Sequence, residues 1–98
     1  MERNLSKALQ LYLGYGDAPF PQQNAQAVTA EFGSDLGPDL ISRTRAVLRD
    51  AGDLRPDWDA MSLLSAKDWV ERDIKDRYPG LSDTAVSAVG WAFSYWWK

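Results

Sequence analysis

Residues 37–52 of this chain have the sequence GPDLISRTRAVLRDAG, which carries the clearest helical pattern in the protein. The residues that suit one buried helix face recur at three- and four-residue steps, at Leu40, Ile41, Thr44, Val47, Leu48 and Ala51. Pro38 suits the first helical position, because its fixed φ is helical and its missing N–H is not needed there. We therefore expect Asp35 or Gly37 to cap a helix that ends at Gly52.

Four other stretches show the same periodicity, over residues 2–13, 22–32, 65–78 and 82–97, with Ser82 as the expected N-cap of the last. Glycine and proline separate the stretches. Residues 57–64 form either a short extra helix or an ordered loop. Because no stretch alternates at period two for long, a β-sheet is not expected. The sequence predicts a single all-α domain over residues 1–98, a compact bundle of four to five helices with a central aromatic C-terminal helix.

The chain is expected to be a cytoplasmic protein that does not enter a membrane. It has no cysteine, so it forms no disulfide. Its longest weakly charged stretch, Thr84 to Trp97, is shorter than the ~20 residues of a spanning helix. The apolar run from Ala8 to Leu13 is short, contains Gln10 and is not followed by an Ala-x-Ala site, so it predicts a helix rather than a signal peptide.

The composition argues against several functional classes. The chain has no histidine and no cysteine, which removes the Ser-His-Asp triad, the Cys-His dyad and the imidazole and thiolate metal ligands. We therefore expect a protein that is not an enzyme, with no cofactor and no metal. The net charge of -3 disfavours binding to nucleic acid and favours a basic protein partner.

Aromatic residues gather at the C-terminus. The last eight residues include Trp91, Phe93, Tyr95, Trp96 and Trp97. Successive helical residues differ in direction by ~100°, so these side chains cannot all point the same way. They make either a core helix with large side chains, or a helix on which Trp96 and Tyr95 stay exposed and anchor a partner.

The loop from Gly14 to Pro21 also carries aromatic side chains, Tyr15 and Phe20. Two glycines permit unusual backbone angles, and two prolines stiffen the second half of the loop. Such a loop presents a binding surface, or it connects two helices while its aromatics cover the end of the bundle. It is not a phosphate loop, because it lacks a third glycine and a Gly-Lys-Ser/Thr sequence.

A third candidate is a group of acidic residues, Asp50, Asp53, Asp57 and Asp59, in which Asp57-Trp58-Asp59 is the densest part. An Asp-x-Asp pair suits hard cations, but the spacing is not that of an EF-hand. The alternatives are solvated carboxylates or helix caps, and an acidic patch that faces a basic partner. Arg49 and Arg55 lie among these acids and partly neutralise them.

Four segments together resemble small helical bacterial proteins of unassigned role: Leu11–Gly16, Pro19–Pro21, Pro79–Ser82 and Trp91–Lys98. In size and acidity the chain also resembles the immunity proteins that neutralise bacterial toxins. This resemblance implies a protein-binding inhibitor of the immunity or antitoxin type whose partner is a basic toxin.

The residues expected to contact that partner are Tyr15, Phe20, Asp57, Trp58, Asp59 and Trp96. Two other functions stay open. One is a helical adaptor or self-associating structural module, such as a phage or regulatory component, which would form a homo-oligomer. The other is a small-molecule binder with a Trp-lined pocket between helices.

Overall fold

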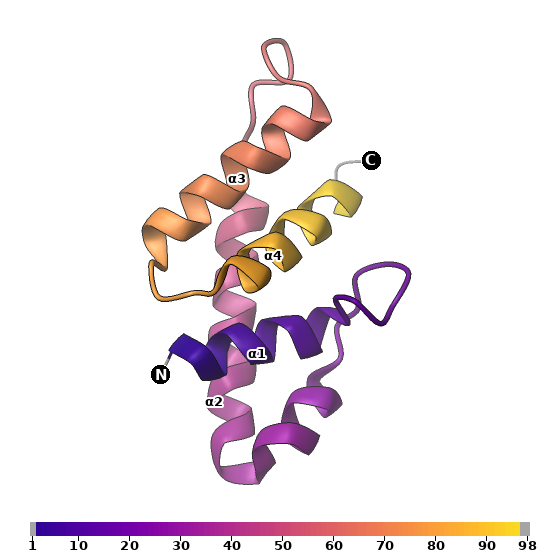
Figure 1. Ribbon diagram of the computed structural model, residues 1–98, viewed down its shortest axis with the longest axis vertical. Helices are drawn as coiled ribbons and strands as arrows, with labels where there is room; N and C mark the ends of the chain where they lie inside the picture. The colour runs from indigo at the N-terminus through magenta and orange to yellow at the C-terminus, as the bar shows by residue number, and fades with distance from the viewer. Residues whose placement is uncertain (1, 97–98) are drawn as a thin grey trace.

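The computed structural model describes residues 2–96, and in that range it contains four α-helices and no strand. They are α1 (Glu2–Leu13), α2 (Ala25–Asp53), α3 (Leu63–Arg77) and α4 (Asp83–Trp96). The molecule measures 45 × 27 × 19 Å, and α2 runs along its length while α1 and α4 cross in front of it (Figure 1). The all-α prediction is confirmed, with four helices.

The longest helix, α2, joins the two helices expected at residues 22–32 and 38–51. The only residue inside α2 with non-helical backbone angles is Gly33, with φ 80° and ψ 177°. Glycine alone adopts this combination at little cost, so the chain kinks here (Figure 1). The expected break at Gly37–Pro38 is wrong, because the helix already resumes at residue 34 and Pro38 lies inside it.

The two arms of α2 approach each other closely beside the kink. A Cβ atom on Gly37 would lie 3.3 Å from the Cα of Thr29. Gly37 therefore serves close packing rather than helix capping.

The observed ends of α1, α3 and α4 agree more closely with the ends expected from the sequence. α1 has the expected bounds, and Gly14 follows it with φ 72°. The Ser82 hydroxyl caps α4, since it accepts a hydrogen bond from the Ala85 N–H at 3.1 Å. α3 begins two residues earlier than expected, because its N-cap is Ser62, whose hydroxyl accepts from the Ser65 N–H at 3.2 Å. Residues 54–62 form an ordered loop.

The core is built around α4, which contacts each of the other three helices. The buried face of α4 consists mainly of small side chains, so its neighbours lie close: Ala85, Val86, Ala88, Val89, Gly90, Ala92 and Phe93. The expected face of α1 is buried against it and α2, at Leu5, Ala8, Leu9 and Tyr12. This packing brings the C-terminal half of α4 beside the end of α1.

The C-terminal helix ends, within the described part of the chain, at Trp96; Trp97 lies outside that part. α4 has 14 residues. Across residues 2–96, no helix combines the length and the apolar character that crossing a membrane requires.

We expect Gly33→Ala to lower the free energy of unfolding by about 1–3 kcal/mol. No atom lies within 4 Å of the added Cβ, so the cost comes from the positive φ and not from a clash. The control is Gly52→Ala, at a helical position where the new Cβ would meet only the Trp96 ring, at 3.9 Å. That change should be neutral or stabilise by up to about 1 kcal/mol. Urea unfolding followed by circular dichroism tests both, and equal stability of the two variants would contradict the kink.

Candidate binding surface

The six residues expected to contact a partner fall in two separate places. Tyr15 and Phe20 lie in the loop after α1, and Trp96 lies at the end of α4, near that loop. Asp57, Trp58 and Asp59 lie in the 54–62 loop, which forms a different tip of the molecule (Figure 1). The fold therefore does not combine them into one surface.

Backbone hydrogen bonds fix both ends of the loop after α1. Gln22 N–H donates to the Leu13 carbonyl and Asn24 N–H to the Tyr12 carbonyl, each at 2.9 Å. Within the loop, the Ala18 N–H donates to the Gly14 carbonyl at 2.8 Å, which closes a turn. The loop therefore has a defined, hydrogen-bonded backbone conformation.

Aromatic contacts attach this loop to α4. The Tyr15 and Trp91 rings are 5.4 Å apart between centroids, and Trp91 and Tyr95 are 5.8 Å apart in an edge-to-face arrangement. The Tyr95 hydroxyl donates a hydrogen bond to the Pro19 carbonyl at 3.0 Å. Offset and edge-to-face ring pairs are favourable geometries, so these contacts hold the loop in place.

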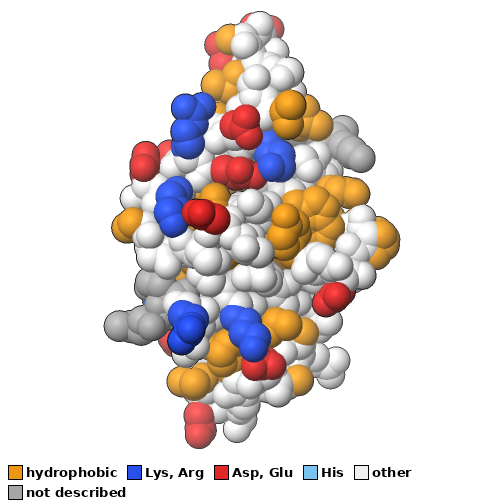
Figure 2. Space-filling model, in the orientation of Figure 1, with side chains coloured by type: hydrophobic (Ala, Val, Ile, Leu, Met, Phe, Trp, Pro, Cys, Tyr) orange, Lys and Arg blue, Asp and Glu red, His pale blue; other side chains and the backbone are white. Residues whose placement is uncertain are grey.

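Three aromatic side chains stay exposed around this junction: Phe20 at 55%, Tyr95 at 37% and Trp96 at 44% of their accessible area. We call these three residues the aromatic surface. Figure 2 shows hydrophobic side chains gathered over the C-terminal half of α4 and on the neighbouring loop. Tyr15 is half-buried, and its ring packs against Trp91, which in turn contacts the aromatic surface.

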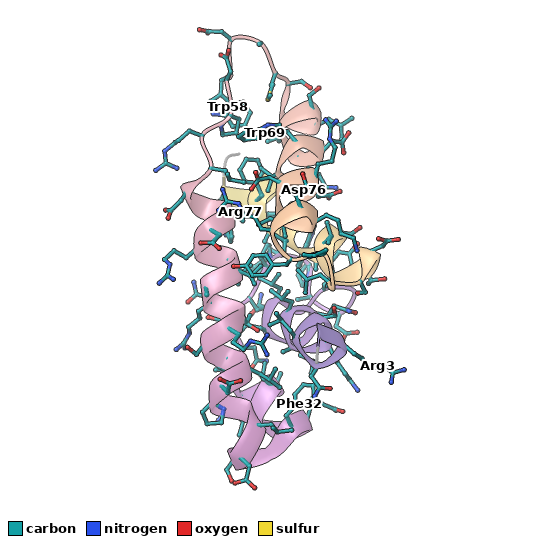
Figure 3. The ribbon with its side chains drawn as sticks, turned by 90° about the vertical axis from the view of Figure 1, so that its left-hand side faces the viewer. Arg3, Phe32, Trp58, Trp69, Asp76 and Arg77 are labelled. Atoms are coloured by element: carbon teal, nitrogen blue, oxygen red, sulfur yellow. The ribbon has the colours of Figure 1, made fainter. Side chains whose placement is uncertain are left out.

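The acidic loop has a structural role at Asp57. The Asp57 carboxylate accepts a hydrogen bond from the Asp59 N–H at 3.1 Å, and its carbonyl accepts from the Ala60 and Met61 N–H groups. The first of these bonds is that of an Asx turn, and the other two close a backbone turn. Trp58 points from the loop toward α3, where Trp69 lies (Figure 3), although 40% of its area stays exposed.

Asp50, the first residue of the expected acidic group, has a structural role between two helices. Its carboxylate accepts a hydrogen bond from the Tyr78 hydroxyl, which links α2 to the end of α3. This hydrogen bond raises the pKa of Tyr78 above its usual 10.0, and burial and the Asp50 charge act in the same direction. In residues 2–96 no cluster of three or more histidine, cysteine or carboxylate side chains is arranged to hold a metal ion.

A pocket of about 440 Å³ lies beside Trp96. The end of α1, residues 21–23, α2 and Trp96 line it, and its charged side chains are Arg45 and Arg49. The Arg45 Nε–H donates to the Tyr12 hydroxyl at 3.3 Å, and the guanidinium lies 6.0 Å from the centroid of that ring. A Trp-lined pocket between helices was one alternative that the sequence left open, but the place of this pocket and its two arginines were not predicted. The one signal for them is that Arg45, Arg49 and Gly52 fall at helical spacing on one side of α2.

In comparisons with known proteins, no protein-family model, no curated protein and no solved structure matches this chain.

Tyr78→Phe should lower the free energy of unfolding by about 1 kcal/mol at pH 7, because the Asp50 carboxylate loses its hydrogen-bond donor. The folded-state pKa of Tyr78 lies above the unfolded value, so this stabilisation is complete below pH 10 and is lost as the pH rises through the raised pKa. The difference between wild type and variant should therefore shrink above pH 10.

Urea unfolding of both proteins at several pH values measures this difference. The matched control is Tyr15→Phe, because the Tyr15 hydroxyl has no hydrogen-bond partner among the described residues. That variant should stay within about 0.5 kcal/mol of wild type at every pH. A Tyr78→Phe difference that persists unchanged at high pH would contradict the assignment.

Proposed function

We propose that this chain is a protein-binding inhibitor of the immunity or antitoxin type, which covers part of a cognate toxin with its aromatic surface. The observation that supports the proposal is the arrangement of Phe20, Tyr95 and Trp96. Three aromatic side chains are exposed together where a short loop and the end of a helix meet.

Exposed aromatics in a fixed geometry are suited to protein recognition. Tyrosine and tryptophan are enriched among the residues that dominate binding energies. Tyr95 is already held by Trp91 and by the Pro19 carbonyl, so little side-chain entropy remains to be lost on binding. Desolvation of these rings would then contribute directly to affinity.

Charge would act mainly on the rate of association. The chain carries a net charge of -3, and a basic toxin would be attracted over distances of about a Debye length. Asp17 is exposed in the same loop as Phe20. We place Asp57, Trp58 and Asp59 outside the contact, because they lie on another part of the molecule and Asp57 forms the turn of its own loop.

The test uses the protein encoded beside this chain's gene as the candidate toxin. We expect a stable complex in which Phe20→Ser weakens binding at least about tenfold, because the change removes an exposed anchor. Leu64→Ser is the matched control, since Leu64 is 70% exposed on α3 and lies outside the aromatic surface. Calorimetry on the purified proteins measures the affinities, and growth on co-expression measures inhibition.

Two results would contradict the proposal. One is a neighbour that is harmless when expressed alone and does not bind. The other is a homodimer in light scattering that Phe20→Ser, but not Leu64→Ser, converts to monomer. The second result would assign the aromatic surface to a self-associating structural module.

A further inference from the structure

The pocket beside Trp96 is basic, although the chain as a whole is acidic. The chain has 14 acidic and 11 basic residues, yet no acidic residue lines this pocket. The groove between α3 and α4 has a mixed lining of three acidic and two basic residues: Asp68, Glu71, Asp83, Arg72 and Lys75. The pocket beside Trp96 is therefore a local positive site on an acidic protein.

Two arginines supply that charge from one side of α2. Arg45 and Arg49 are one helical turn apart, so their Cα atoms are about 6 Å apart along the axis, a spacing at which two guanidinium groups reach one anion. Neither is paired with a carboxylate within residues 2–96. Asp53 follows Arg49 by one turn but does not line the pocket.

One hydrogen bond orients the exposed Arg45 side chain before any ligand binds. Its Nε–H bonds to the hydroxyl of Tyr12, which is a buried core residue. The remaining N–H groups of the guanidinium keep their capacity to donate. A pre-positioned guanidinium loses less conformational entropy when it pairs with a carboxylate.

Apolar side chains form part of the remaining lining, beside the polar Gln22 and Gln23. Leu13, Pro21 and Leu48 form apolar walls, and the Trp96 ring lies over Gly52, 3.9 Å from where a Cβ would be. An indole face and aliphatic walls favour a planar apolar group. A volume of about 440 Å³ lies in the range of small-molecule sites.

We propose that this pocket binds a small organic carboxylate with a flat apolar body, that is, an aromatic acid. The carboxylate accepts hydrogen bonds from Arg45 and Arg49, and the ring lies between Trp96 and the aliphatic wall. This site shares Trp96 with the aromatic surface, but Arg45 and Arg49 belong to the pocket alone, so a change at either arginine tests the pocket separately from the inhibitor role.

The experiment titrates the full chain with 2-naphthoate at pH 7 by calorimetry. We expect one site with a dissociation constant of about 1 mM or tighter. The neutral analogue 2-naphthamide should bind at least about tenfold more weakly, because it has no charge for the arginines to pair with. Arg49→Gln should weaken naphthoate binding by at least about the same factor. Thermal unfolding verifies that this variant is folded.

Arg3→Gln is the matched control. Arg3 points into solvent from α1, away from the pocket (Figure 3), and its replacement should leave naphthoate affinity unchanged. The proposal is overturned by the absence of saturable binding, by equal binding of acid and amide, or by equal effects of the two arginine variants. Loss of a protein partner on Arg49→Gln without any naphthoate binding would also overturn it and would assign the pocket to the protein interface.

Discussion

The close packing of α4 against its neighbours connects α1 to α3. Within the described residues α1 and α3 do not contact each other, and both pack on α4. The contact with α3 is close enough that the side chain of Glu71 occupies the space a Cβ on Gly90 would need. Glu71 is held there by Lys67, at 2.5 Å. A larger residue at position 90 would displace this ion pair. α2 also contacts both α1 and α3, so α2 and α4 together connect these two helices.

The same helix connects the fold to the candidate binding surface. Its buried face ends with Ala92 and Phe93, and the next residues on other faces are the exposed Tyr95 and Trp96. Tyr95 reaches the loop after α1, while Trp96 reaches the pocket beside α2. Because both aromatics are consecutive on one short helix, their directions differ by ~100° and they serve two neighbouring features. Core packing thus sets where the aromatic surface and the pocket lie.

Helical periodicity was enough to predict the all-α class and the buried faces. The pattern at Leu5, Ala8, Leu9 and Tyr12 identified a helix whose bounds agree with the structure. Capping was predictable at Ser82, where a hydroxyl precedes an apolar run. The start of α3 was expected at Ser65 but lies at Leu63, because Ser62 and Ser65 both suit the N-cap and the structure uses the first.

The kink lies at Gly33, directly after the stretch expected at residues 22–32, but local signals also predicted a break at Gly37–Pro38 that the structure does not have. Both Gly33 and the Gly37–Pro38 pair resemble helix breaks, and tertiary contact decides between them: the approach of Thr29 makes Gly37 a packing residue. The candidate site is also tertiary. Sequence identified Phe20 and Trp96 as separate features, but not that the loop and α4 meet, nor that Asp57 would be used in its own turn. Contacts between residues that are far apart in the sequence leave no periodic pattern in it.

Native-state hydrogen exchange at the C-terminal end of α4 measures whether packing holds this end of the helix in place. If the aromatic surface is preformed, the backbone amides of Ala92, Phe93 and Tyr95 should exchange with opening free energies within about 1 kcal/mol of global unfolding. Exchange of these amides at nearly no free-energy cost, while the amides at the middle of α4 stay protected, would contradict this expectation. That result would mean that the last turn of α4 frays and that neither the aromatic surface nor the pocket exists before a ligand binds.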